Sequence, residues 1–186
     1  MNTMTERLVV GGVALVVGLG LGWVGHGLTR YNTATESVTA FQDWRSACPP
    51  AATAQQSCEI IQDILDGKTR SEIARVVIAH DNGKPVVGIT LPLGVALLPG
   101  MGISFGTDPV KVVQYRTCNG QGCIAELPLD DKLQASFDAG KDGKLIFAGM
   151  DNKPVSVLLS LKGFADAQRD NRNNEARRGS WFWRMW

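Results

Sequence analysis

The hydrophobic and polar positions divide the chain into an apolar N-terminal run, a short polar segment and a long region of alternating apolar runs and turns. Residues 8–28 contain no Asp, Glu, Lys or Arg. A helix of this length measures about 31 Å, enough to cross the hydrocarbon core of a bilayer. We therefore predict a single transmembrane anchor. The alternative is a cleaved signal peptide, whose apolar region is usually shorter, about 7–15 residues.

Small residues recur every three or four positions within this run and share one face of the expected helix. They are Gly11, Ala14, Gly18, Gly22 and Gly25. Small residues allow a second helix to approach closely, so this face is a candidate surface for packing against an integral membrane protein. The alternative is that glycine is simply frequent in membrane helices.

Residues 29–40 are polar and short-sided, which indicates a linker, and the folded domain is expected over residues 41–164. Within the domain, short apolar runs alternate with turn residues, a pattern typical of antiparallel hairpins. Three hairpins are expected: Ile73–Ala79 with Pro85–Thr90, Val110–Cys118 with Cys123–Leu127, and Leu145–Met150 with Val155–Leu161.

Helix signals are scarce. The segment Asp130–Ala139 places Leu133 and Phe137 four residues apart behind an acidic first turn, which predicts one short helix. Residues 165–186 are expected to form a polar helix followed by an aromatic tail. Because strands dominate, we predict a mainly β fold, an antiparallel β-sandwich or small barrel with one or two short helices, preceded by the transmembrane helix.

The segment Leu91–Ile103 is unusually apolar and contains prolines and glycines. The favoured interpretation is buried core. The alternative is an exposed apolar patch that meets a partner or lipid.

Composition and charge exclude one class of partner. The chain of 186 residues carries nineteen basic and eighteen acidic residues, for a net charge of +1, so no clustered basic surface for nucleic acid is expected. A hydrophobic share of 44% is sufficient for one globular core.

The four cysteines fall into two close pairs, Cys48 with Cys58 and Cys118 with Cys123. Two local disulfides are favoured over free buried thiols, and over a metal site, which needs closer spacing or histidine partners. Disulfides imply an oxidising compartment. In a bacterium this places residues 1–7 in the cytoplasm and the domain in the periplasm, on a single-pass inner-membrane protein.

No catalytic, cofactor-binding or metal-binding site is predicted. The chain contains no nucleophile elbow, zincin helix or phosphate loop. His80 and the neighbouring Asp81 lie at an expected hairpin turn, and Asp130 and Asp131 are better placed to open a helix than to bind calcium. We therefore expect a protein that is not an enzyme.

The chain ends in an aromatic and basic tail. Its candidate interface residues are Arg177, Arg178, Trp181, Phe182, Trp183, Arg184 and Trp186. Tryptophan and arginine are frequent both in protein interfaces and at the membrane surface. Docking into an integral membrane protein complex is favoured, membrane lipid is the next choice, and packing on the chain's own domain is the third.

Four segments resemble motifs of the invasion-associated locus B family. They are Phe41-Gln42-Asp43-Trp44 followed by Cys48, then Leu91-Pro92-Leu93-Gly94 with Leu98, Gly100 and Ile103, then Cys118 with Gly122-Cys123-Ile124-Ala125, and finally Leu161-Lys162-Gly163-Phe164. The resemblance covers about residues 41–168. It implies a secreted or periplasmic β-rich domain of alphaproteobacterial type and the disulfide pairs Cys48–Cys58 and Cys118–Cys123.

This chain departs from the family pattern in its expected anchor and in its extension beyond Phe164. These two features favour a non-catalytic accessory subunit or assembly factor of an inner-membrane complex, respiratory or photosynthetic. The alternative is an invasion- or adhesion-associated protein that acts in host interaction or envelope stress, as the family name suggests.

Overall fold

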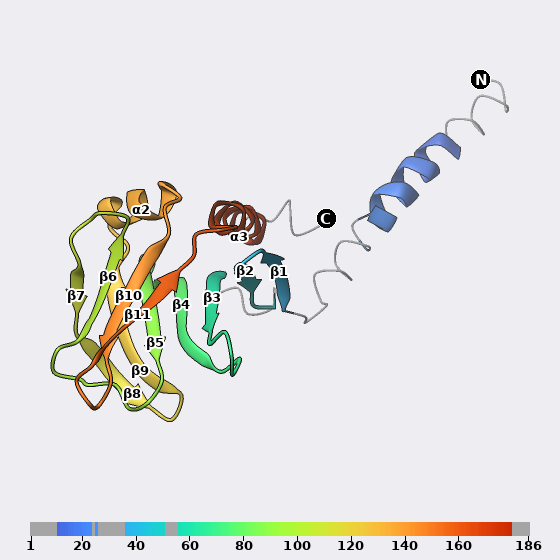
Figure 1. Cartoon of the computed structure of the whole chain (residues 1–186). Helices are drawn as coiled ribbons and strands as arrows, with labels where there is room; N and C mark the ends of the chain where they lie inside the picture. The colour runs from blue at the N-terminus through green and yellow to red at the C-terminus, as the bar shows by residue number, and fades with distance from the viewer. Residues whose placement is uncertain (1–10, 24, 26–35, 51–55, 180–186) are drawn as a thin grey trace, which may run out of the picture.

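The computed structural model describes residues 11–23, 25, 36–50 and 56–179. Its domain contains two antiparallel β-sheets that face each other, with two helices at their margins (Figure 1). The expected mainly β, antiparallel fold is confirmed. Because the strands fall into two separate sheets, the fold is a sandwich and not a closed barrel.

The larger sheet has seven strands in the spatial order β1-β2-β3-β4-β5-β9-β8. Their bounds are β1 Ser37–Phe41, β2 Trp44–Cys48, β3 Glu59–Leu65, β4 Glu72–Asp81, β5 Lys84–Leu91, β8 Tyr115–Asn119 and β9 Gly122–Pro128.

The smaller sheet has four strands in the order β11-β10-β6-β7. Their bounds are β6 Met101–Phe105, β7 Lys111–Val113, β10 Gly143–Ala148 and β11 Pro154–Leu159. The helices are α2 Asp131–Asp138, which matches the expected short helix, and α3 Phe164–Gly179, which forms most of the expected polar helix.

The first and third expected hairpins are confirmed, as β4–β5 and β10–β11. In the first, Asn82 and Gly83 both have positive φ, at 49° and 77°. Two central residues of this kind form the type I′ turn whose twist matches that of the flanking strands. The Asn-Gly pair therefore sets the register of the hairpin.

The second expected hairpin needs a correction. The run Val110–Cys118 is not one strand: it divides at Gln114 into β7, which joins the smaller sheet, and β8, which pairs with β9 in the larger sheet. Val113 pairs with Met101, whereas Tyr115 pairs with Ala125. A β-branched run indicates extended chain, but its change of partner depends on where the two sheets meet.

The expected linker is also too long at its C-terminal end. Residues 37–40, which the sequence assigns to the linker, belong to β1 and pair with β2. The three expected hairpins did not include β1, β2, β3 and β6. These strands lack the sequence signal of a hairpin, which is a tight turn with a strongly apolar run on each side.

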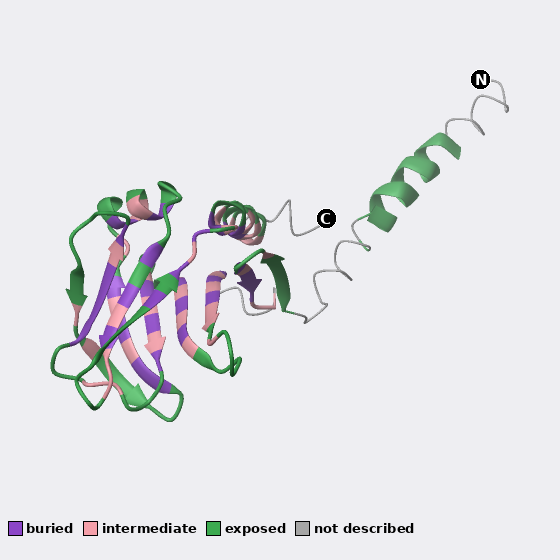
Figure 2. Cartoon of the chain, viewed as in Figure 1, coloured by how far each residue is buried: buried purple, intermediate pink, exposed green. Residues whose placement is uncertain are grey.

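The core lies between the two sheets (Figure 2). Buried side chains alternate along the central strands, as in Val87, Ile89 and Leu91 of β5. This period of two directs every second side chain inward. Helix α3 contacts β1, β2 and β3 and buries Phe164 and Ala167.

Residues 11–23 are helical and exposed along their whole length. Within the described part of the chain, no helix is both long and apolar enough to cross a bilayer. Parts of the expected span 8–28 lie outside the described residues, so the transmembrane anchor stays a prediction.

Candidate interaction surfaces

Two of the sequence motifs meet in a buried contact, which we call the closing junction and define as residues 41–44 and 160–164. Trp44 is only 1% exposed, and its indole N–H donates to the Ser160 carbonyl at 2.8 Å. The Phe164 ring meets the Trp44 ring edge to face, with centroids 5.1 Å apart. The beginning of α3 is thereby attached to the first hairpin of the domain.

The closing junction has no room for a side chain at Gly163. This glycine has a φ of 83°, and a Cβ added to it would lie 2.0 Å from the Phe41 carbonyl oxygen. Nearby, the Ser160 hydroxyl donates to Asp43 at 2.6 Å. Packing and hydrogen bonding therefore explain why the Gly-Phe pair and the Asp-Trp pair occur at these positions.

The far end of α3 lies against the first disulfide. Cys48 and Cys58 are bonded, and the Cys58 backbone N–H donates to the Glu175 carboxylate. Arg178 donates to the carbonyls of Pro49 and Gln56, the latter at 3.0 Å. The helix is thus held to the domain at both of its ends.

The start of β1 and the end of α3 lie at the same end of the domain. Ser37, the first residue of β1, pairs with Cys48, the last residue of β2. Arg178, one residue before the end of α3, contacts the loop that follows Cys48. The first residue of β1 and the last turn of α3 therefore both lie beside the Cys48–Cys58 bond.

The second disulfide closes the tight turn between β8 and β9. Cys118 and Cys123 are bonded and are also directly opposed in the strand ladder. Both bonds are those that the family resemblance implies, and no described cysteine is free. Because a disulfide constrains the unfolded chain, the two bonds stabilise strands near opposite edges of the larger sheet.

The favoured interpretation of Leu91–Ile103 as continuous core is wrong in its middle. Leu91 and Ile103 are buried, but residues 92–94 and 97–99 are exposed. This loop pairs through its backbone with the β10–β11 turn. We call the exposed apolar side chains of the two segments the apolar tip, defined as Leu93, Leu97, Leu98 and Met150. Their exposed fractions are 61%, 51%, 95% and 79%. The apolar residues at the two ends of the segment therefore belong to the core, and those in its middle form an exposed surface.

Backbone contacts hold the apolar tip in place. Val95 forms a bridge with Gly149, the Ala96 N–H donates to the Ala148 carbonyl at 2.8 Å, and the Met150 N–H donates to the Gly94 carbonyl at 3.1 Å. The loop is thus paired with the neighbouring turn. Its leucines are presented to solvent by a defined backbone.

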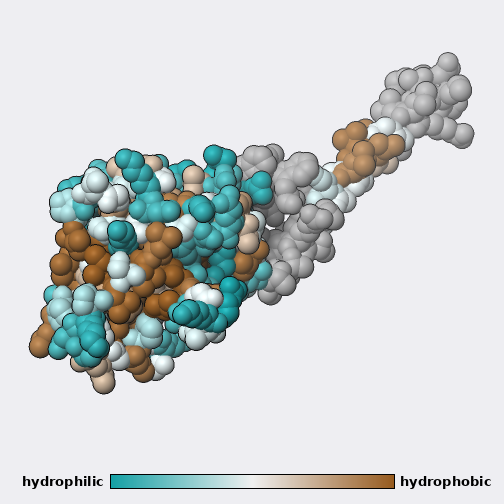
Figure 3. All heavy atoms as spheres, in the orientation of Figure 1, coloured by the Kyte–Doolittle hydropathy of each residue, from teal (hydrophilic) through white to brown (hydrophobic). Residues whose placement is uncertain are grey.

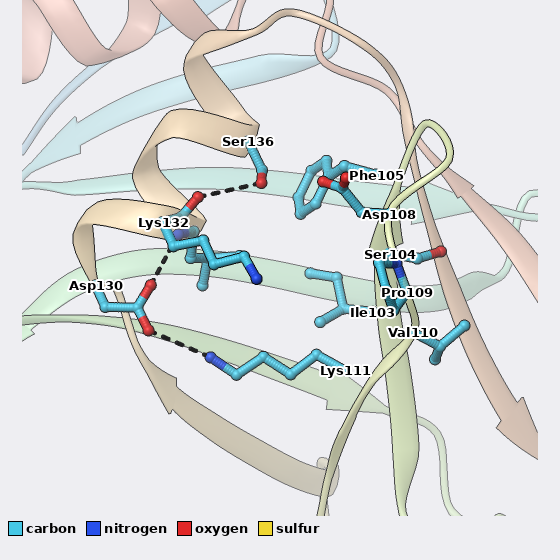
Figure 4. A pocket seen from close by; sticks show the side chains of 11 residues that line it. Ile103, Ser104, Phe105, Asp108, Pro109, Val110, Lys111, Asp130, Lys132 and Ser136 are labelled. Atoms are coloured by element: carbon cyan, nitrogen blue, oxygen red, sulfur yellow. Dashed lines mark hydrogen bonds and ion pairs between the residues drawn. The ribbon is translucent and has the colours of Figure 1, made fainter.

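A cavity of about 270 Å³ lies between β6, β7 and α2 (Figure 4). Ile103, Phe105 and Leu133 form its apolar part, and Lys111 bridges to Asp130 at 3.5 Å across one side. No sequence motif predicted this cavity. The one part of its lining that the sequence indicated is the start of α2. There Asp130 accepts the Leu133 N–H at 2.8 Å.

The Asp130 carboxylate is stabilised in its charged form. The hydrogen bond from the Leu133 backbone lowers the pKa of Asp130, and the positive charge of Lys111 lowers it further. The cap geometry confirms that the acidic pair opens a helix, because Asp130 is the N-cap of α2 and Asp131 lies in its first turn. With an apolar interior and a closed ion pair beside it, the cavity can hold a small apolar group but contains no paired nucleophile and base.

A charged cluster lies on the outer face of the larger sheet. Asp63 accepts hydrogen bonds from Arg45 and from Arg75, the latter at 2.7 Å, and Arg75 also pairs with Glu72 at 2.9 Å. Burial raises the pKa of Asp63, but the hydrogen bonds and charges of the two arginines outweigh burial and lower it below its usual value. The cluster links three neighbouring strands.

His80 and the possible metal ligands are the remaining candidates for a catalytic or metal site. His80 is exposed in β4, where it pairs with Pro85 next to the hairpin turn. Among the described residues, no group of three His, Cys, Asp or Glu side chains could hold a metal ion.

The residues predicted to form a partner or membrane interface are only partly described. Gly11, Ala14, Gly18, Gly22 and Gly25 all lie in exposed helix. Arg177 and Arg178 lie in the last turn of α3. The aromatic tail residues Trp181, Phe182, Trp183, Arg184 and Trp186 lie outside the described residues.

Three comparisons with known proteins point to the same family that the sequence motifs resemble. A family model described as "Invasion associated locus B (IalB) protein" matches residues 44–170. Invasion protein B homologs from two Brucella abortus strains, 2308 and biovar 1 strain 9-941, are 26% identical over 129 residues, covering 68% of this chain and 74% of each relative.

A solved structure shares the fold. The crystal structure of invasion associated protein B from Bartonella henselae matches with a TM-score of 0.65 and 19% identity, over 75% of this chain and 99% of that one.

Proposed function

Because the chain belongs to the invasion associated locus B family, we propose that it is a non-catalytic interaction protein of the bacterial envelope that acts in host interaction or envelope stress. The match over residues 44–170 carries this proposal. The similar Brucella proteins are named as homologs of invasion protein B, which fits the same class. All four cysteines are in disulfides, so none is available as a nucleophile.

We further propose that residues 8–28 anchor the chain in the inner membrane, with the domain in the periplasm. Two disulfides fit an oxidising compartment. The shared position of the start of β1 and the last turn of α3 beside Cys48–Cys58 supports the same arrangement. It allows the anchor and the aromatic tail to meet one membrane surface, where tryptophan and arginine are favoured.

Location is tested by fractionation. We expect the full chain to stay with inner membranes after alkaline carbonate extraction, and the domain to be degraded by protease only after the outer membrane is opened. Release by carbonate contradicts the anchor. Degradation on intact cells contradicts the periplasmic location and places the domain on the cell surface.

The role is tested by deleting the gene and restoring it in three forms: the full chain, a chain that ends at Gly179, and a chain with Trp44→Ala as a folding-defective control. The cut at Gly179 keeps α3, which helps to hold the first disulfide loop. We expect the full chain to restore host-cell entry or resistance to envelope-damaging detergent. If the deletion strain keeps both host-cell entry and detergent resistance, the proposal is contradicted.

The accessory-subunit hypothesis receives no support from the comparisons. The same strains test it, because a subunit copurifies in mild detergent with one membrane complex in constant proportion. If the full chain brings down such a complex and the chain ending at Gly179 does not, the tail is a docking element and the accessory role replaces the invasion-associated role.

A further inference from the structure

We propose that the apolar tip inserts into a lipid bilayer. This inference deepens the proposed envelope function and rests on it for the direction in which the tip points. Leu98 is 95% exposed, and the loop from Pro92 to Pro99 contains no charged residue. An exposed apolar loop held by backbone hydrogen bonds is a preformed protrusion that can enter a membrane surface without rearranging.

The strand register places the tip far from the start of β1. Thr39 pairs with Ser46, and this row continues through Ile60 and Ile78 to Val87. Ser37 and Cys48 lie two residues beyond this row, so they are level with the first residues of β5. The loop of the tip follows Leu91, at the other end of β5. A strand rises about 3.3 Å per residue, so the two ends are roughly 20 Å apart along β5 alone.

If residues 8–28 anchor the domain and the end of the sheet that carries Ser37 faces that membrane, the tip points away from it. The bilayer that it enters is a second, opposing one. The aromatic tail and the tip would then meet different bilayers.

The size of the tip favours lipid over a protein partner. A stable protein interface uses about 20–30 residues from each side and buries about 800 Å² of each partner. The tip presents only four exposed apolar side chains, three on the loop after β5 and Met150 on the β10–β11 turn. Such a surface is too small for a stable protein interface by itself, whereas each apolar side chain that enters a bilayer contributes independently to binding.

The outer face of the smaller sheet is the rival surface. Figure 3 shows hydrophobic side chains gathered over β6, β10 and β11. However, the row across these strands runs from Ser104 through Lys144 to Leu158, so polar and charged groups interrupt it. Leu158 is 58% exposed and belongs to this face, not to the tip. It therefore provides a matched control.

The test uses the full anchor and domain in lipid nanodiscs, in a chain that ends at Gly179 so that the tail cannot contribute. Protein-free vesicles of phosphatidylethanolamine and phosphatidylglycerol with a fluorescent lipid are added, and their capture is measured. We compare the parent chain with the double variant Leu97→Asp, Leu98→Asp, the control Leu158→Asp and the conservative variant Leu98→Phe. Thermal unfolding checks that each variant is folded.

We expect the double variant to lower capture by about ten-fold or more, because two apolar side chains are replaced by charges that a bilayer rejects. Leu158→Asp should stay within about two-fold, and Leu98→Phe should retain capture. Equal capture by the double variant overturns the proposal. Loss in Leu158→Asp but not in the double variant moves the contact to the sheet face and also overturns it.

Carbonate extraction separates the two proposals. If carbonate releases the full chain but capture by the soluble protein still depends on Leu97 and Leu98, the anchor is wrong and bilayer insertion by the tip stands. If the anchor holds and vesicles are not captured, insertion is wrong and the anchored envelope role stands.

Discussion

The closing junction and the apolar tip use similar residue types for opposite purposes. In the junction, Trp44 and Phe164 are 1% and 2% exposed, and a hydrogen bond and a ring contact fix the indole. In the tip, by contrast, Leu98 is 95% exposed. It lies in an apolar segment that contains glycine and proline. The junction holds the fold together, whereas the tip is left available for binding. Substitutions should therefore affect stability in one region and association in the other.

The largest expected loss of stability comes from Gly163→Ala in the junction. Left-handed backbone costs a residue with a Cβ about 1–2 kcal/mol, and contact with the Phe41 carbonyl should raise the total to about 3 kcal/mol or more. Gly140→Ala is the matched control, since Gly140 has a φ of 66° with nothing near its Cβ. Chemical denaturation measures both free energies of unfolding, and equal losses contradict the role of the contact.

Removal of the first disulfide should have the next largest effect. Chain entropy predicts a loss of about 3 kcal/mol for Cys48→Ser with Cys58→Ser, and about 2 kcal/mol for the shorter Cys118–Cys123 loop, given sequence separations of 10 and 5. Denaturation of the two double variants measures the difference. A larger loss at Cys118–Cys123 would show that strand geometry, and not loop length, determines the effect.

Acid should weaken the strands next to the junction by a smaller amount. The pKa of Asp63 is lowered in the folded protein from its ordinary value of 3.8. Its ion pairs therefore stabilise the fold fully above that value, and their contribution is lost as the pH falls through the lowered pKa. After solvent screening, we expect about 1 kcal/mol or less. Urea unfolding across this acid range should show a weaker pH dependence in Asp63→Asn than in the control Asp108→Asn.

The smallest expected effect on stability is that of Leu98→Asp in the tip. An exposed side chain away from the core should change the free energy of unfolding by about 0.5 kcal/mol or less. Leu91→Asp is the matched comparison, because Leu91 precedes the same loop and is fully buried. A fall in the melting temperature with Leu98→Asp comparable to that with Leu91→Asp would show that the tip is part of the core.

The sequence predicted those elements whose signals are local. Asn82-Gly83 with apolar runs on both sides indicated the β4–β5 hairpin, and an acidic pair ahead of Leu133 indicated α2. It did not reveal that Val110–Cys118 changes sheets at Gln114, because both halves are simply extended. The cavity beside α2 was missed for a similar reason, since Ile103 and Leu133 are brought together only by tertiary packing.

By itself, the sequence determined the mainly β character of the domain, the two nearby cysteine pairs and the family motifs, because turns, alternation and short loops depend on neighbouring residues. Only the tertiary structure decided which apolar residues are buried. Hydrophobicity measures how strongly a side chain avoids water, but the arrangement of the sheets determines whether cover is available. Trp44 is covered by Phe164 of α3, whereas Leu98 is left exposed to solvent.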